Sequence, residues 1–178
     1  VLKKLVLSGN KILDEGAIAI GESLKTNSTL EELYLSDCEI GAAGGKAIGV
    51  GLQAGIAVLK SIDLSHNMLE FQAVNALASA LAGNAVTLDI SHNWLGPVGA
   101  KAIAEALQSG TAVLTSIDVG YNGLDEEVAL GIVRAVRQHD KMTFLGLASC
   151  KIGPAGAKEI AEYVSVTAVL TNLDLTNN

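Results

Sequence analysis

Hydrophobic residues recur along this 178-residue chain in short alternating runs at nearly even spacing. Each run follows the pattern L-x-x-L-x-L-x-x-N/C-x-L. One residue separates the second and third apolar positions, so their side chains share one face of a short strand and the intervening side chain takes the other. The runs begin at Leu2, Leu30, Leu59, Ala85, Leu114, Met142 and Leu170, which are 28, 29, 26, 29, 28 and 28 residues apart. The pattern predicts strands over residues 4–7, 32–35, 61–64, 87–90, 116–119, 144–147 and 172–175.

A helical pattern occupies the second half of each repeat. In the segment Gly16–Leu24, for example, small and apolar residues fall on one stripe of a helix. Pro97 and Pro154 stand where the first helical residue is expected, a position that proline favours. Asp14 and Asp125 are expected to cap the N-termini of their own helices. The sequence therefore predicts six helices between the seven strands.

Alternating strands and helices build a right-handed coil, with a parallel sheet on one side and the helices on the other. Helices are wider than the strand spacing of about 4.8 Å, so the stack is expected to bend into a horseshoe. The parallel sheet then lines the concave face and the helices cover the convex face. The short spacing before Ala85 predicts that the connection after the third helix, which ends near Leu81, is two residues tighter than its neighbours.

These repeats resemble the ribonuclease-inhibitor-like class of leucine-rich repeats, which uses long repeats with a true helix and a G-A-x-A-I-A-x-A-L type of segment. That class includes ribonuclease inhibitor, the repeat regions of NOD-like receptors, the Ran GTPase-activating protein and tropomodulin-like proteins. The resemblance implies an α/β leucine-rich repeat solenoid that binds a partner protein and works as a sensor or scaffold region. It leaves open an alternative, the regulation of an enzyme by inhibition or by GTPase activation.

The resemblance covers residues 1–178, which we expect to form one domain of six repeats plus a seventh strand. Solenoids usually end in atypical repeats that cover the last hydrophobic face. Leu2 and Leu5 have nothing before them, and the seventh strand stops at Asn178 without its helix. We therefore expect the chain to be a piece of a longer array that associates end to end through these termini.

The composition narrows the choice of partner. The formal net charge of −7 argues against nucleic acid, because phosphate binding needs clustered Lys and Arg, and it favours a protein partner with a basic surface. Two cysteines are too few for a disulfide scaffold, which indicates a reducing compartment and a cytoplasmic location. The uncharged segment Phe71–Leu88 contains recurring polar residues, so it predicts a buried amphipathic helix and no membrane span.

One polar position recurs where the chain leaves each strand. Backbone groups at that turn need buried partners, and an inward Asn amide can donate and accept hydrogen bonds at once. Asn fills the position in most repeats and Cys fills it in two, where we expect structural thiols that lie too far apart for a disulfide. The residues are Asn10, Cys38, Asn67, Asn93, Asn122, Cys150 and Asn178.

Two patterns that suggest a cofactor or metal do not satisfy their motifs. The run Gly41–Ala47 opens a helix, yet it lacks the glycine and hydroxyl positions of a phosphate-binding loop, so its glycines are expected to let helices pack closely. His66 and His92, three residues beyond Asp63 and Asp89, suggest zinc. In an extended strand, however, that odd spacing points His and Asp to opposite faces. With no nucleophilic triad spacing either, we expect no enzyme activity, cofactor or metal.

The outward positions of the strands are free to vary for binding. Between the second and third apolar positions, three neighbouring strands carry Asp63, Asp89 and Asp118, and like charges placed side by side destabilise a sheet. Two explanations stay open. Aspartate is common in such strands, where nearby hydroxyls can donate to it, as from Ser61, Ser65, Ser91 and Ser116. Alternatively, the three carboxylates contact Lys or Arg of a partner.

Four aromatic residues lie near these carboxylates in the predicted fold. Tyr34 and Phe144 occupy outward strand positions, and Trp94 and Tyr121 lie on the turns. Exposed aromatic residues beside charges are common anchors of protein interfaces. The predicted partner-binding residues are therefore Tyr34, Asp63, Asp89, Trp94, Asp118, Tyr121 and Phe144.

Overall fold

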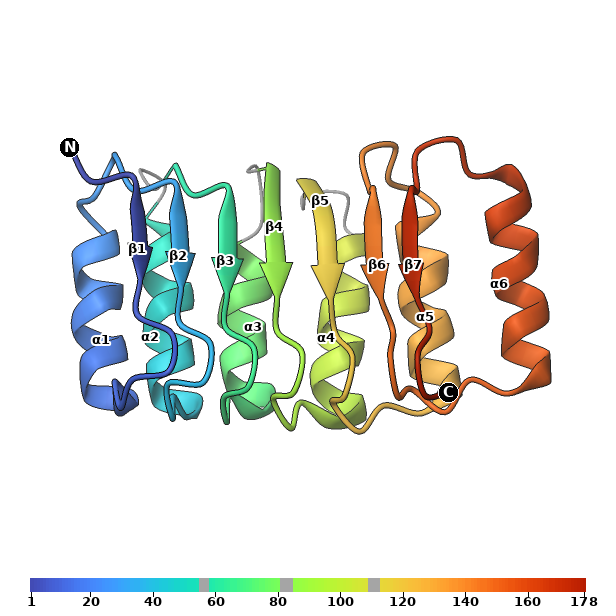
Figure 1. Cartoon of the computed structure of the whole chain (residues 1–178), viewed down its shortest axis with the longest axis horizontal. Helices are drawn as coiled ribbons and strands as arrows, with labels where there is room; N and C mark the ends of the chain where they lie inside the picture. The colour runs from blue at the N-terminus through green and yellow to red at the C-terminus, as the bar shows by residue number, and fades with distance from the viewer. Residues whose placement is uncertain (55–57, 81–84, 109–112) are drawn as a thin grey trace.

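The computed structural model describes residues 1–54, 58–80, 85–108 and 113–178, in which seven parallel strands form one sheet in chain order (Figure 1). The strands are β1 (Lys4–Val6), β2 (Glu32–Tyr34), β3 (Ser61–Asp63), β4 (Ala85–Asp89), β5 (Val113–Asp118), β6 (Phe144–Gly146) and β7 (Asn172–Asp174). The helices that alternate with them are α1 (Leu13–Leu24), α2 (Ala42–Gln53), α3 (Glu70–Ala80), α4 (Gly96–Gln108), α5 (Glu126–Val136) and α6 (Pro154–Val166).

All seven predicted strands are confirmed, and each ends one residue earlier than predicted. Five begin at the predicted residue, whereas β4 and β5 begin earlier, at Ala85 and Val113. A register shift between Val86 and Thr87 separates this extension from the regular part of β4. The predicted tight connection after α3 falls on residues 81–84, outside the described residues.

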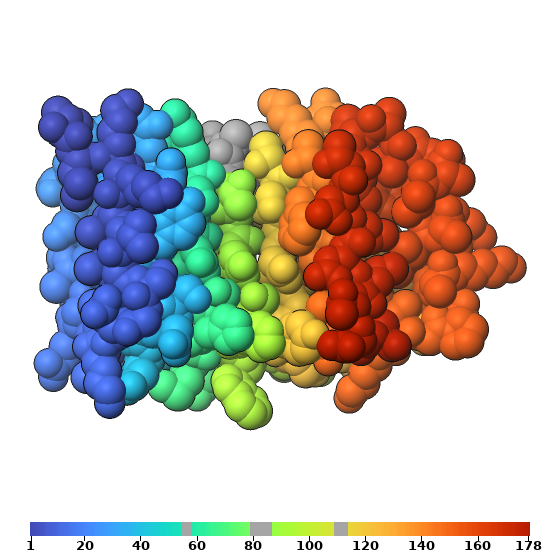
Figure 2. All heavy atoms as spheres, in the orientation of Figure 1, coloured from blue at the N-terminus to red at the C-terminus, as the bar shows by residue number. Residues whose placement is uncertain are grey.

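The helices form a second layer behind the sheet, and their row extends beyond the strands at both ends (Figure 1). The sheet is therefore the shorter, concave side and the helices form the convex side, which confirms the predicted solenoid. Inward side chains of the middle strands are at most 2% exposed and fill the space between the layers, as at Leu33, Ile62, Leu88, Ile117 and Leu145. Within the described residues, each repeat packs against the repeats next to it, and the repeats follow one another as colour bands in Figure 2.

The glycines of α2 form the expected packing seam. A Cβ built on Gly49 would lie 2.6 Å from the backbone carbon of Ala76 in α3, closer than side-chain carbons approach. On the other side of α2, a Cβ on Gly51 would collide with the backbone of Gly21 in α1. Larger residues would push these helices apart, so the glycines allow the helices of the convex layer to pack closely.

The observed helix caps agree with the prediction at Asp125 and differ from it at Asp14. Asp125 caps its own helix, because its Oδ1 accepts a hydrogen bond from the Val128 amide at 3.0 Å. The prediction for Asp14 is wrong, since this residue lies inside α1 and caps the next helix. Its Oδ1 accepts from the amides of Gly41 at 2.9 Å and Gly44 at 2.8 Å, at the start of α2. Stacked helices begin side by side, so a first-turn carboxylate can reach the neighbouring N-terminus.

The same inter-repeat cap recurs near the C-terminal end of the stack. Glu126, in the first turn of α5, accepts from the amides of Gly153 at 2.9 Å and Gly156 at 2.8 Å. Pro154 is the first residue of α6 as predicted, whereas Pro97 is the second residue of α4. Among the described residues, no helix is both long and apolar enough to cross a membrane.

Candidate functional site

The register of the sheet brings three carboxylates side by side on the concave face. Asp63 of β3 pairs with Asp89 of β4, which pairs with Asp118 of β5. We call these residues the acidic row. Each is half-buried, and none of the ion pairs formed within the described residues involves them. The row therefore concentrates negative charge that the described part of the chain does not neutralise with a cation.

One oxygen of each carboxylate is used by the chain itself. Asp63 Oδ1 accepts from the Ser65 amide at 2.9 Å and from the Ser65 hydroxyl at 2.7 Å. Asp89 Oδ1 accepts from the amide and hydroxyl of Ser91 at the same two distances. These bonds hold the turn that follows each strand, which gives the aspartates a structural role. The Oδ2 atoms receive no hydrogen bond from the described residues and remain available.

Asp118 is the last residue of the acidic row, and neighbouring groups lie close to its carboxylate. Its Oδ1 accepts from the Gly120 amide at 2.9 Å, and its carboxylate lies over Gly146, where a Cβ would collide with it. Burial raises the pKa of Asp118, and the charges of Asp89 and Asp174 raise it further. Burial also raises the pKa of Asp89, with a smaller contribution from Asp63. A cation at this face would offset the repulsion between these carboxylates and the free-energy cost of their burial.

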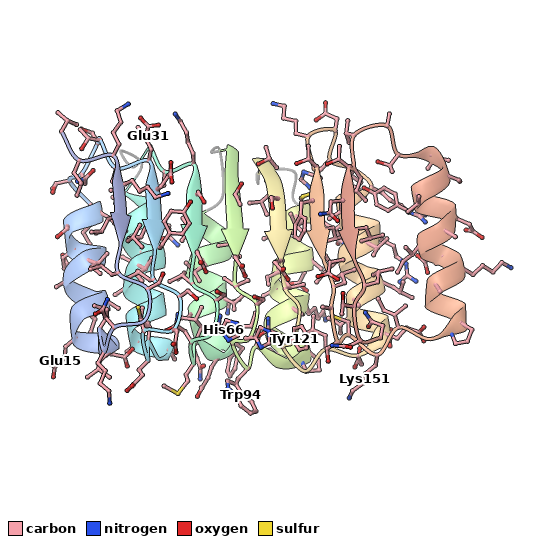
Figure 3. The ribbon with its side chains drawn as sticks, viewed as in Figure 1. Glu15, Glu31, His66, Trp94, Tyr121 and Lys151 are labelled. Atoms are coloured by element: carbon pink, nitrogen blue, oxygen red, sulfur yellow. The ribbon has the colours of Figure 1, made fainter. Side chains whose placement is uncertain are left out.

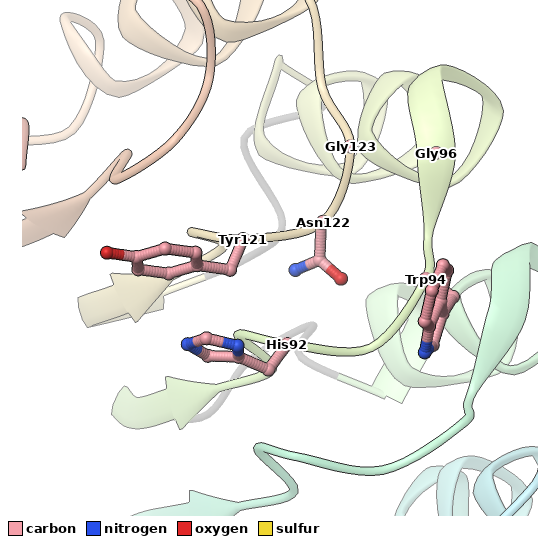
Figure 4. Close-up of a pocket in the computed structure, with 6 residues that line it drawn as sticks. All are labelled: His92, Trp94, Gly96, Tyr121, Asn122 and Gly123. Carbon is pink, nitrogen blue, oxygen red and sulfur yellow. The ribbon is translucent and has the colours of Figure 1, made fainter. Parts of the chain in front are cut away.

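A stack of three rings runs parallel to the acidic row, three residues further along the chain, in the turns that follow β3, β4 and β5. The rings of His66 and His92 lie 4.0 Å apart at 13°, and those of His92 and Tyr121 lie 4.2 Å apart at 12° (Figures 3 and 4). We call these residues the ring stack. All three have a left-handed backbone, with φ between 53° and 55°. The stack was not predicted from the sequence, where its signal was an aromatic residue at one position of three successive repeats.

The two histidines do not extend into a metal centre. Among the described residues, no group of three His, Cys, Asp or Glu side chains is placed to hold a metal ion. Burial lowers the pKa of His92, and the neighbouring His66 lowers it further, against an opposite effect from Asp89. At neutral pH, His92 is therefore a neutral imidazole.

The recurring amides form a buried ladder in the middle repeats, where Asn67, Asn93 and Asn122 are at most 4% exposed. Each amide reaches the backbone of the preceding repeat, as Asn93 does when it donates to the Leu64 carbonyl at 2.7 Å. Asn10 is exposed, and it donates to the carbonyl of Leu7 at 2.8 Å. The ladder therefore ties consecutive turns together.

The two cysteines at the ladder position are fully buried and unpaired. Cys38 donates to the Leu7 carbonyl at 3.2 Å, and Cys150 donates to the Ala148 carbonyl at 3.6 Å. Burial raises the pKa of both thiols, that of Cys150 to about 12. Thiols with such a high pKa are poor nucleophiles at neutral pH.

The four predicted aromatic anchors occupy three different places. Tyr34 and Phe144 are half-buried on β2 and β6, on either side of the acidic row. Lys4 lies 4.5 Å above the Tyr34 ring. Tyr121 belongs to the ring stack, whereas Trp94 is 80% exposed and projects from the rim where strands turn into helices (Figure 3). The sheet face thus gathers the carboxylates with Tyr34, Phe144 and Tyr121, and Trp94 stands apart from them.

Comparison with known proteins supports this architecture. A family model described as Leucine Rich repeat matches residues 1–21, 26–49, 86–104 and 140–161. Human NACHT, LRR and PYD domains-containing protein 5 is 27% identical over 181 residues, which cover 99% of this chain and 15% of that protein. Human NACHT, LRR and PYD domains-containing protein 13 is 28% identical over 179 residues, covering 98% of this chain and 17% of that protein. The chain therefore spans a small part of these relatives.

A solved structure supports the fold alone. The structure of Leiomodin-1 Actin-Binding Site 2 superposes with a TM-score of 0.54 at 16% identity, and the match covers 92% of this chain and 79% of that chain. The sequence motif, the sheet of parallel strands backed by helices and these similarities agree with one another. The chain is therefore similar to leucine-rich repeat proteins in both its sequence motif and its fold.

Proposed function

We propose that this chain is a protein-interaction module whose concave sheet face binds a basic segment of a partner protein. The observation that carries the proposal is the acidic row, in which Asp63, Asp89 and Asp118 stand in register without a cation from the described residues. The matching family model and the two human relatives support a repeat module of the interaction or sensor type.

Electrostatics favours such a partner on two counts. Lys or Arg near the free Oδ2 atoms would offset the repulsion within the row, and opposite potentials speed the encounter of two proteins. Tyr34 and Phe144 flank the row and would supply apolar contacts, with Tyr121 at its edge. We also propose a cytoplasmic location, where the unpaired thiols of the chain would stay reduced.

A charge-neutral triple variant tests the proposal. The change of Asp63, Asp89 and Asp118 to Asn keeps the turn acceptors and removes three charges. The probe is an arginine-rich peptide, compared with a peptide in which Gln replaces every Arg. If each lost charge pair contributes about 0.5 kcal/mol, the triple variant binds the arginine-rich peptide about tenfold more weakly. Its binding should also depend less on salt, because salt screens exposed charges.

A second triple variant provides the matched control. Glu127→Gln, Asp140→Asn and Glu162→Gln remove the same number of charges from exposed positions that lie outside the strands. This control should bind the arginine-rich peptide like the unmodified chain. Equal weakening of both variants would mean that net charge alone attracts the peptide, and that result would overturn the assignment to the acidic row.

A further inference from the structure

A second surface lies on the rim where strands turn into helices, on the side of Trp94. Four large apolar side chains are exposed there, and their exposed fractions are 48% for Met68, 43% for Phe71, 80% for Trp94 and 66% for Val98. Met68 and Trp94 occupy the same position in consecutive repeats, and Phe71 and Val98 lie in the first turns of α3 and α4. The described residues leave much of each of these side chains in contact with solvent.

The fold does not require a large residue at the position of Trp94. Its φ is 57°, in the left-handed region that bulky side chains rarely adopt. The same position of the next repeat holds Gly123, at a φ of 69°. Glu39 and Lys151 share this backbone at the equivalent position, each with a φ of 55°, so the left-handed turn belongs to the repeat and the bulky Trp94 gains little burial there.

Two hollows open along this rim. The first has a volume of about 340 Å³ and is lined by Trp94, Gly96, Gly123 and part of the ring stack (Figure 4). The second has a volume of about 530 Å³ and is lined by Met68 together with Leu13. The second hollow extends over the first three repeats and the first hollow over the fourth and fifth, so they follow one another along the rim, with Met68 and Trp94 at their adjoining edges.

Carboxylates surround the apolar part of the second hollow. Exposed Glu15, Glu39 and Glu70 line it, and Glu39 pairs with Lys11, whose Nζ lies 3.3 Å from Glu39 Oε1. Glu15 and Trp94 both lie along the lower edge in Figure 3. The rim thus combines exposed apolar groups with excess negative charge, and it would repel a second copy of this acidic chain or an anionic lipid surface.

We propose that this rim binds an amphipathic, basic helix of a partner protein. Neighbouring repeats are spaced by about 5 Å at the sheet, close to the distance of about 5–6 Å between residues four apart on a helix. Two apolar side chains at that spacing would pack against Met68 and Trp94, where the two hollows adjoin. Lys or Arg on the flank of the same helix would meet Glu15, Glu39 and Glu70.

The single tryptophan of the chain gives a direct signal for this surface. The probe is a tryptophan-free helical peptide of about 18 residues, with Leu four residues apart and Lys on the flanks. Its binding should shift the Trp94 emission to shorter wavelength and protect it from acrylamide, in a saturable way. A peptide with Glu in place of every Lys should leave the emission unchanged. No shift with the basic peptide, or an equal shift with the acidic one, would overturn the proposal.

Two variants that keep Trp94 complete the test. Met68→Gln should weaken the peptide about tenfold, as expected for a central interface contact, whereas Val164→Gln should not, although Val164 is equally exposed at 49% on α6. The triple Asp-to-Asn variant of the acidic row should bind this peptide with unchanged affinity. A negative result at the rim is therefore distinct from a negative result at the concave face. Equal effects of the two Gln variants would overturn the proposal. An emission shift produced by chain concentration alone, or only by anionic vesicles, would assign the rim to another occupant and overturn it too.

Discussion

Replacement of Asn67 by Ala should destabilise the fold by removing five side-chain hydrogen bonds from the buried ladder. Asn67 is 4% exposed, and its Oδ1 accepts from the amides of Cys38 at 3.1 Å and Ile40 at 2.9 Å. Its Nδ2 donates to the carbonyls of Leu35, at 2.8 Å, and of Leu64 and Ser65, both at 3.0 Å. Alanine retains none of these bonds.

The expected magnitude follows from the groups that lose their partners. Each orphaned buried amide costs about 1–3 kcal/mol, and two amides lose the Asn67 oxygen. The Leu64 carbonyl is less affected, because Asn93 Nδ2 also donates to it at 2.7 Å. We therefore expect a loss of about 3 kcal/mol in the free energy of unfolding. With a urea dependence of about 2 kcal/mol per M, the midpoint should fall by about 1.5 M.

The control is Asn10→Ala, which changes the same repeat position where it is exposed. Asn10 donates to the carbonyls of Leu7 at 2.8 Å and Ser8 at 3.4 Å, and water can replace it, so the cost should stay below about 1 kcal/mol. Asn67→Cys should fall between the two, because a thiol donates weakly but does not replace the amide oxygen. Equal midpoint shifts for Asn67→Ala and Asn10→Ala would refute the argument, provided that the urea slope is unchanged.

Three further outcomes are expected. Trp94→Gly should leave the melting temperature unchanged or raise it, because relief of a left-handed backbone worth about 1–2 kcal/mol outweighs a glycine entropy cost of about 0.5–1 kcal/mol. Asp118→Asn should raise stability at pH 7. The pKa of Asp118 is raised in the fold, so the native chain gains stability as pH falls through that pKa and the advantage of Asn disappears in acid, as urea titrations across pH would measure. Cys150, with a pKa of about 12, should react with iodoacetamide only as fast as the protein opens.

The fold could be predicted because each repeat carries, within its own sequence, the patterns that specify its strand and its helix. One alternating run sets each strand, one helical stripe sets each helix, and the recurrence of both fixes parallel order. Each strand ends one residue earlier than predicted, although residues such as Leu64 and Ile90 are still buried like inward strand residues and still donate to the next strand, at Asp89 and Asp118. The early start of β4 at Ala85 falls in the repeat with the shortened spacing, where the regular period gives no guide.

The features that were not predicted all depend on contacts between repeats. Asp14 is a plausible cap for its own helix by sequence order, yet the neighbouring helix presents its amides closer. His66 and His92 occupy equivalent positions of adjacent repeats, which suggested a zinc site with the aspartates before them, and Tyr121 was not included with them. Listing residues by repeat position shows His66, His92 and Tyr121 as one column. The left-handed turn then brings their rings face to face, and period-two alternation does not describe that turn.

The two proposed surfaces have one property in common, because each contains a feature that destabilises the unbound chain. In the acidic row, the buried and crowded carboxylates of Asp89 and Asp118 have raised pKa values. On the rim, Trp94 combines a left-handed backbone with 80% exposure. Departures of this kind from local preference concentrate where a protein binds or acts. The ring stack connects them, since His92 and Tyr121 follow the acidic row along the chain and also line the hollow beside Trp94. A partner with a basic segment on the sheet could therefore continue over the stack to the rim as one interface.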